Sequence, residues 1–402
     1  MAPEGGLLID LSRSPDGLGD ARITSHRALG LARAFVGKRV DDAVKTVPLL
    51  FNICGMAQGS AVAEAAEHAL GEQAIGKVAP GERAFDAMRR VNARRVRHLL
   101  VQAEIAREHM ISMVRDTAHH LDTEASETAT LRILKCYKAL ASAIDPRRDA
   151  FTIGASLSPD QGALEAAADA LATTIEDLVL AEPILRFEAR QSEASFMAWL
   201  RAGRSHAQCL ASLIVERGWS PEGDVATDFL PSLAETELAR SLAGDAADLF
   251  ARQPTWLGAP KETGPLSRQH DAPLVQALTA AYGRGLLTRF AARLVELARL
   301  PARLRATAGT SELSIRAASP ALGHGIAQVE ASRGRLIHSI EVVGDLVKSY
   351  AIVAPTEWNF HPAGSGRRSL ARIAARPRDV EEVAGLFVAS LDPCVAYDVR
   401  VR

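Results

Sequence analysis

The chain has 402 residues, of which 48% are hydrophobic and 24% charged, and its formal net charge is -1 at pH 7. This composition is ordinary for a globular protein with a sizeable core, and the near-zero charge gives no reason to expect nucleic acid or an anionic membrane as a partner. No stretch is apolar over the ~20 residues of a membrane helix, and no signal peptide is evident, so we expect a cytoplasmic protein without a membrane partner. Only 4 cysteines occur, so we expect no disulfides.

The first part of the chain is predicted to hold one strand and two helices. Residues 6–11 are predicted to form a short strand and residues 24–36 a helix. Residues 55–70 are rich in alanine, so Cys54 should lie at or just before a helix N-terminus. There the helix dipole and free backbone amides favour the thiolate, which is the form that a metal ligand requires.

Long helices are predicted for the middle of the chain. Apolar residues keep helical spacing over residues 82–121 and again over 130–144. A third helix is expected to start from an N-cap serine, Ser158, and to run toward Leu180. Further helices are predicted at 193–217, at 233–252 within a connector of residues 218–270, and at 273–300, ending at Pro301.

After the last of these helices the period of the pattern changes to two. Apolar and polar residues alternate over 335–342 and 346–353, which predicts a β-hairpin with Gly344 in its turn. The elements together indicate one mainly α-helical domain over residues 1–402 with a small β component. Its parts are an amino-terminal cysteine region (1–80), a helical middle (81–260) and a carboxy-terminal region with the hairpin and a second cysteine motif (261–402).

Two of the cysteines stand out for their surroundings. Cys136 and Cys209 lie inside predicted helices among apolar neighbours, where a lone cysteine is most often an inert core residue. Cys54 stands at the predicted helix start, and Cys394 directly follows Asp392-Pro393, which stiffens the chain.

Both segments resemble the cysteine motifs of nickel-iron hydrogenase large subunits. In that family the first motif reads Arg-x-Cys-Gly-x-Cys-x-x-x-His and the last reads Asp-Pro-Cys-x-x-Cys-x-x-His. This chain keeps the first cysteine of each pair, Cys54 and Cys394, and has Ala57 and Tyr397 in place of the second. Three further matches follow in the family's order: Glu4-Gly5-Gly6-Leu7, residues 262–268, and residues 329–338 with 353–359.

The resemblance implies a large-subunit-like fold, a long-helix bundle plus β-hairpin, and a set of site residues. In that family an arginine and a threonine hydrogen-bond the cyanide ligands of the iron, so the counterparts are Arg333 and Thr356, with Pro355 in the pocket wall. Guanidinium and hydroxyl groups are suitable donors to cyanide. His338 is either a supporting residue of the site or a core histidine, and the pattern does not decide between them.

The lost cysteines imply that nickel is not bound, since the family's nickel needs four thiolates. Two thiolates, Cys54 and Cys394, suit an iron that brings its own ligands, so Fe(CN)2(CO) is the expected transient cargo. Residues 52–58 and 358–362 look especially like the HupK/HoxV type of hydrogenase expression/formation protein. That likeness implies a non-catalytic scaffold that delivers the fragment to the hydrogenase large subunit in company with HypC- and HypD-type maturation proteins.

The sequence leaves three alternatives open. The chain is alternatively a divergent hydrogenase-like oxidoreductase with a different metal set, a metal-free structural relative like the related subunit of respiratory complex I, or a chaperone that binds the immature large subunit without iron. The missing second cysteines argue against the enzyme. Retention of Cys54, Cys394 and Arg333 argues against the metal-free structural relative, whereas metal analysis would distinguish the chaperone from an iron carrier.

Overall fold

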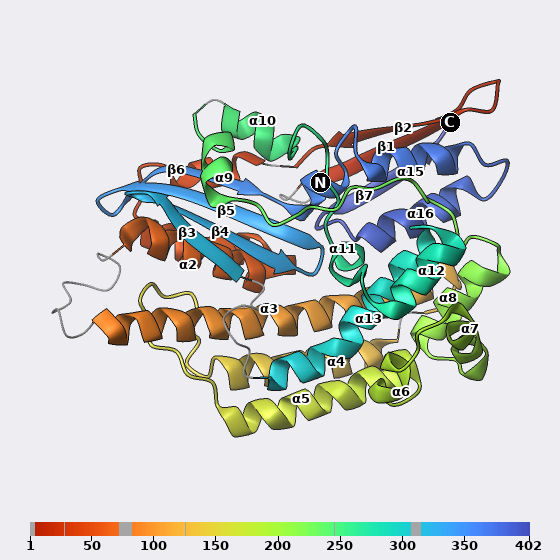
Figure 1. Ribbon diagram of the computed structural model, residues 1–402, viewed down its shortest axis with the longest axis horizontal. Helices are drawn as coiled ribbons and strands as arrows, with labels where there is room; N and C mark the ends of the chain where they lie inside the picture. Colours follow the sequence, from red (N-terminus) through yellow and green to blue (C-terminus); the bar gives the residue numbers. More distant parts are fainter. Residues whose placement is uncertain (1–4, 28, 72–82, 125, 245, 307–314) are drawn as a thin grey trace.

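The computed structural model describes residues 5–27, 29–71, 83–124, 126–244, 246–306 and 315–402. A layer of long helices lies beneath two β-sheets, and helix α2 (Gly55–Leu70) lies between that layer and the larger sheet (Figure 1). Because α2 packs on both sides, nearly all of its residues are buried, and its many alanines and glycines allow neighbouring backbone to approach. The fold is mainly helical, as the sequence predicts.

The larger sheet is antiparallel, with the strand order β3-β4-β5-β6. The predicted hairpin is confirmed as β5 (Gly334–Val343) and β6 (Leu346–Val353), and the sheet is completed by β3 (Ile315–Ala321) and β4 (His324–Ala331). One face of the sheet packs against α2, and the other packs against α9 (Glu235–Ser241) and α10 (Ala246–Arg252). Strand β4 is therefore buried on both faces and lacks the period-two pattern that reveals a strand.

The smaller sheet joins segments from both ends of the sequence. Strand β1 (Gly6–Arg13) pairs antiparallel with β2 (Gly19–Ser25) and parallel with β7 (Ala396–Val401). The strand predicted at 6–11 is confirmed, but the helix predicted at 24–36 is wrong. A glycine with positive φ, Gly17, turns the chain back on itself, and the β-branched pair Ile23-Thr24 continues the ladder before a short 3-10 helix, η1 (Leu29–Phe35).

The predicted helices of the middle region form the lower layer. Helices α3 (Arg83–His120) and α4 (Glu127–Ile144) confirm two of them. The remaining helices, apart from those bounded below, are α1 (Val40–Leu50), η2 (Asn52–Cys54), α6 (Ile184–Glu188), α11 (Pro265–Gln269), α14 (Pro355–Asn359), α15 (Ser365–Ala374) and α16 (Val380–Leu391). In the described parts of the chain, no helix is both long enough and apolar enough to cross a bilayer.

Several predicted helices have different ends or are broken. The third helix starts from Asp160, not Ser158, because the Asp160 carboxylate accepts from the Ala163 amide; it is α5 (Gln161–Ile175), followed by one π-helical turn to Leu180. The span 193–217 is two helices, since Ser205 forms a capping box with Gln208 and starts a new one. These are α7 (Glu193–Ala202) and α8 (His206–Glu216), and 233–252 likewise divides into α9 and α10.

The long helix predicted at 273–300 is also two helices, α12 (Pro273–Tyr282) and α13 (Leu286–Arg305). The break falls at Gly283, which has a φ of +63°, and at Gly285, where a Cβ would lie 2.5 Å from the Ser220 carbonyl oxygen. Pro301 does not end α13, because it costs one hydrogen bond near the terminus while the buried Leu300 and Leu304 hold the last turn.

Candidate functional site

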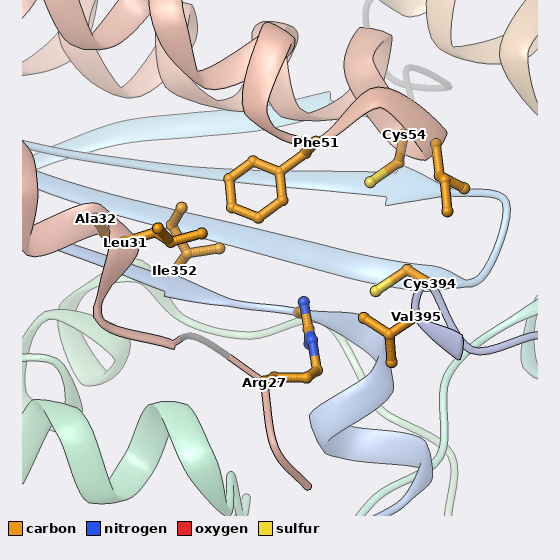
Figure 2. Close-up of a pocket in the computed structure, with 10 residues that line it drawn as sticks. Arg27, Leu31, Ala32, Phe51, Cys54, Ile352, Cys394 and Val395 are labelled. Carbon is orange, nitrogen blue, oxygen red and sulfur yellow. The ribbon is translucent and has the colours of Figure 1, made fainter. Parts of the chain in front are cut away.

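Cys54 and Cys394, 340 positions apart (394 - 54 = 340), face one small cavity (Figure 2). Cys54 is the N-cap of α2, and Cys394 follows α16 on the way into β7. Apart from the two thiols and Arg27, the described residues that line the cavity are apolar: Leu31, Ala32, Phe51, Ile53, Ile352, Ala354 and Val395. The fold therefore brings together the two thiols that the sequence singles out.

The surroundings of Cys54 differ from the predicted ones. The first free amides of α2, those of Met56 and Ala57, donate to the Glu104 carboxylate at 2.9 and 3.0 Å, so they are not available to a thiolate. Burial, then the nearby charges of Cys394 and Glu104, raises the pKa of Cys54 to about 12. The prediction that the helix terminus favours a thiolate here is wrong, because desolvation outweighs the dipole and a carboxylate takes up the amides.

A chain of buried hydrogen bonds leads from the larger sheet to Cys54. The Tyr350 hydroxyl lies 2.9 Å from His338 Nδ1, His338 Nε2 lies 2.9 Å from Gln58 Oε1, and Gln58 Nε2 lies 3.8 Å from Cys54 Sγ. Burial lowers the pKa of His338 to about 3, so the ring is neutral. With Tyr350 donating to Nδ1, Nε2 carries the proton and donates to Gln58, whose amide is then oriented to donate to the sulfur. His338 therefore belongs to the core and also supports the site.

Cys394 has a hydrogen-bond partner of its own in Thr356, on α14. Thr356 Oγ1 lies 3.1 Å from Cys394 Sγ and also accepts from the Cys394 backbone amide at 3.3 Å. Either the hydroxyl or the thiol can be the donor in the contact with sulfur, and a thiolate would accept from the hydroxyl. Pro355, at the first position of the same helix, is buried beside Ala354, which lines the cavity.

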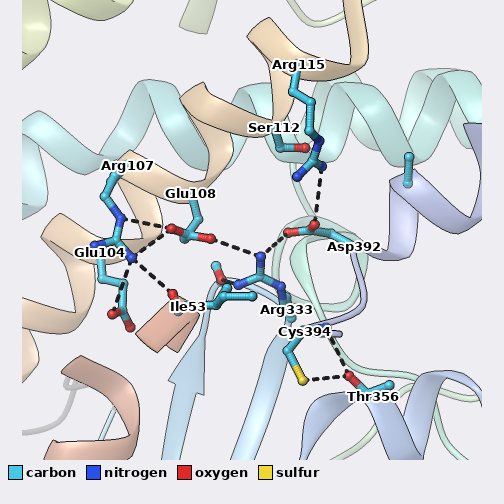
Figure 3. Close-up of polar contacts among 12 residues, drawn as sticks. Ile53, Glu104, Arg107, Glu108, Ser112, Arg115, Arg333, Thr356, Asp392 and Cys394 are labelled. Atoms are coloured by element: carbon cyan, nitrogen blue, oxygen red, sulfur yellow. Dashed lines mark hydrogen bonds and ion pairs between the residues drawn. The ribbon is translucent and has the colours of Figure 1, made fainter. Parts of the chain in front are cut away.

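Arg333 stands at the centre of a partly buried charge network (Figure 3). Its Nη2 lies 2.9 Å from Glu108 and 3.1 Å from Asp392, and the network continues to Arg107 and Arg115. Although burial opposes charge on Asp392, Arg333 holds the pKa of this carboxyl below its usual range. Asp392 takes a left-handed backbone conformation (φ +48°) as it ends α16, and the chain then turns toward Cys394.

Two guanidinium nitrogens near the thiols have no hydrogen-bond partner. Both Arg27 Nε and Arg333 Nε are buried and unpaired, a state that costs free energy unless a ligand supplies the acceptor. No three of the described His, Cys, Asp and Glu side chains form a group that could hold a metal ion. Two thiols, unused donors and apolar walls suit a metal that carries its own acceptor ligands.

A wide groove of about 720 Å³ adjoins the cavity and shares Ile53 and Val395 with it. Arg333 and Asp392 form part of its floor, and Tyr397, which stands at the position of a lost cysteine, is 40% exposed on its wall. The two shared residues therefore lie between the groove and the thiols.

Four residues of the site were not predicted from the sequence: Arg27, Gln58, Glu104 and Tyr350. Gln58 carried a usable signal, since it stands four positions after Cys54 on one helix and therefore shares its face. The other three come from distant elements, and nothing in their local sequence marks them.

The chain is similar to several proteins of known family. A sequence profile described as nickel-dependent hydrogenase matches residues 272–399. The chain is 28% identical over 372 residues to the hydrogenase expression/formation protein HupK of Azotobacter vinelandii, covering 92% of this chain and 91% of that protein. It is 38% identical over 174 residues to the hydrogenase expression/formation protein HoxV of Cupriavidus necator, 41% of this chain and 43% of that one. The predicted likeness to the HupK/HoxV type is confirmed.

Solved structures confirm the predicted fold. The nickel-iron-selenium hydrogenase of Desulfovibrio vulgaris Hildenborough superposes with a TM-score of 0.59 at 15% identity, covering 95% of this chain and 94% of that one. The corresponding enzyme of Desulfomicrobium baculatum gives a TM-score of 0.59 at 16% identity, with 95% of each chain covered. The chain has the fold of a hydrogenase large subunit.

Proposed function

We propose that this chain, a relative of the HupK/HoxV type of hydrogenase expression/formation protein, is a non-catalytic scaffold that holds the Fe(CN)2(CO) fragment for delivery to the hydrogenase large subunit. The observation that carries the proposal is the single cavity onto which Cys54 and Cys394 both open, with unpaired guanidinium nitrogens close by. The fragment is the cargo of this protein. Its iron would be held by the two sulfurs, and its cyanide nitrogens would accept from Arg333 and Thr356.

The protonation of Cys54 supports a holding site from which the cargo is released. With a pKa of about 12, Cys54 is a thiol at neutral pH before cargo binds, so iron must displace a proton to bind there. The proton competes with iron for the Cys54 sulfur, and this competition favours release of the iron. Two protein ligands also bind less firmly than the four thiolates of the nickel-iron site.

Loading requires the site to widen. The cavity between the thiols has a volume of about 30 Å³, roughly the volume that one water molecule occupies in the liquid. The adjoining groove meets it at Ile53 and Val395, so movement of these two side chains would join the two spaces. We expect HypC- and HypD-type proteins, and later the large subunit, to approach through this groove.

The residues at the positions of the lost cysteines argue against the enzyme alternative. Ala57 is fully buried in α2, and its amide is bound to Glu104, whereas Tyr397 faces the groove. Neither side chain can bridge nickel and iron. The named relatives are expression/formation proteins, which also favours an accessory role.

Infrared spectroscopy of the chain purified with its maturation partners tests the proposal. We expect cyanide and carbonyl stretching bands and bound iron without nickel. The bands should vanish in Cys54→Ala and in Cys394→Ala, since each removes one of two protein ligands. Cys136→Ala is the matched control, because this cysteine is buried against the helical layer and should leave the bands unchanged. A parent protein without the bands would contradict the proposal.

A further inference from the structure

Arg27 is the one charged side chain among the described residues that line the cavity, and no sequence pattern predicts it there. It follows strand β2, and its side chain reaches toward the space below Cys54 and beside Cys394 (Figure 2). Its side chain is only 7% exposed. A buried cation in an otherwise apolar wall is costly unless negative charge or acceptors face it.

The internal partners of Arg27 satisfy only part of its guanidinium group. Nη1 lies 2.7 Å from the Glu357 carboxylate on α14, the helix that also carries Thr356. This ion pair fixes the orientation of the side chain, while Nε keeps no partner. Burial opposes the charge of Arg27, but nearby acidic groups, Cys394 first and then Glu357, more than offset it, so the pKa of Arg27 is raised. Arg27 and Cys394 line the same cavity, so the guanidinium can contact what the thiol binds.

We propose that Arg27, together with Arg333, makes the pocket selective for the charge of its cargo. The pocket accepts an anionic metal complex whose outer atoms accept hydrogen bonds, and it rejects a bare divalent cation. The inference rests on the proposed function and extends it. Two thiolates with Fe(II) and two cyanides carry a net charge of -2, and the unpaired Nε–H groups of Arg27 and Arg333 can donate to the cyanides. A bare dication at the thiols gives these donors no acceptor and lies beside the positive charge of Arg27.

The first test uses Cd²⁺ alone with the cargo-free chain, so it does not depend on delivery of the iron fragment. Cadmium bound to thiolates absorbs in the near ultraviolet, and a titration followed by this band gives the affinity. We expect Arg27→Gln to bind Cd²⁺ about tenfold more tightly than the parent, because a buried like charge is removed. Arg27→Lys keeps the charge and should keep the affinity of the parent.

The second test compares the infrared spectra of the same variants purified with the maturation partners. In Arg27→Gln we expect one cyanide band to shift, the carbonyl band to move less, and retained iron to fall about tenfold, the effect of losing a charge-assisted hydrogen bond. Arg27→Lys should also shift the cyanide band, since it lacks the Nε–H donor.

Two controls separate this role from a structural one. Arg190→Gln removes another partly buried arginine paired with a carboxylate, Glu182, in the helical layer, and should change neither readout. The double variant Arg27→Gln, Glu357→Gln avoids leaving a buried carboxylate unpaired if the single variant folds poorly. Unchanged Cd²⁺ affinity or unshifted cyanide bands in folded Arg27→Gln would overturn the proposal. A parent without any cyanide bands overturns the proposed function instead.

Discussion

At Cys54, hydrogen bonding and burial act on the thiol in opposite directions. Gln58 donates toward the sulfur and favours the thiolate, whereas burial and the neighbouring charges of Cys394 and Glu104 favour the thiol, and they prevail. Glu104 acts through more than its charge, since its carboxylate binds both helix amides that would otherwise stabilise negative charge on Cys54. The protonation state of the site therefore depends on a residue from α3.

Glu104 should make the stability of the protein depend on pH. Burial raises its pKa from 4.5 to about 7, so between these values the folded chain holds a proton that the unfolded chain has released. The stability linked to this proton is full below pH 4.5 and is lost as the pH rises through 7. In Glu104→Gln this pH-dependent contribution is absent. We therefore expect the unfolding free energy of the parent minus that of the variant to fall by about 3 kcal/mol as the pH rises from 4.5 to 7.

Urea unfolding of both proteins at several pH values between 4.5 and 8 measures this difference. Buried histidines such as His338 titrate in both proteins and cancel. A difference that stays constant with pH would show that Glu104 is ionised throughout and that burial does not raise its pKa.

At the level of elements, close packing of α2 against the larger sheet determines where Cys54 lies. At Gly325 in β4 a Cβ would lie 1.9 Å from the Ala65 carbonyl oxygen and 2.6 Å from the Ala69 amide nitrogen, both backbone atoms of α2. No side-chain rotation can relieve such a contact. The position of Cys54, at the start of α2, depends on this packing.

We therefore expect Gly325→Ala to lower the free energy of unfolding by about 1–3 kcal/mol, as overpacking of a core does. The variant should also retain less iron, because α2 must move away from the sheet and carry Cys54 with it. Gly30→Ala is the control, since Gly30 is exposed and no heavy atom lies within 4 Å of its Cβ position. Thermal or urea unfolding checks both; equal stability of the two variants would contradict the close packing.

The sequence predicted those elements whose signal is local. The alanine-rich α2, the long α3 and the β5–β6 hairpin were predicted because periodicity and composition mark them. Strand β4 was missed, because burial on both faces removes its alternation, and the breaks at Gly283 and Ser205 were missed because tertiary contacts choose among several possible caps. Four arginines near the carboxy terminus bind residues 20–21 and 222–226, which no local pattern reveals: Arg367, Arg368, Arg372 and Arg376.

At the scale of the whole molecule, the parallel pairing of β1 with β7 joins the first strand to the last one and fixes the segment that carries Cys394. The Arg402 amide donates to Leu11 in this ladder, so by alternation the Arg400 amide also faces β1, while that of Val401 faces away. Motif resemblance predicted Cys54, Cys394, Arg333 and Thr356. It could not predict Arg27 or Glu104, whose roles arise only when distant elements pack together.

Proline substitution in β7 tests how far this pairing holds the site. Arg400→Pro removes a ladder hydrogen bond, so we expect it to lower stability and to speed alkylation of Cys394 several-fold, whereas Val401→Pro removes an outward-facing amide and should do less. Mass spectrometry of alkylated protein over time gives both rates. Equal rates for the two variants would show that β7 does not position Cys394.

The separation of the two thiols along the chain also has a consequence for biosynthesis. Because Cys54 and Cys394 lie 340 positions apart, a ribosome has made almost all of the described chain before the second thiol emerges. Contacts so distant in sequence form late and slowly in folding. An unfinished chain offers only one of the two sulfurs that face the cavity, so under the proposed function iron could be held only after the second thiol has been made and the cavity has formed.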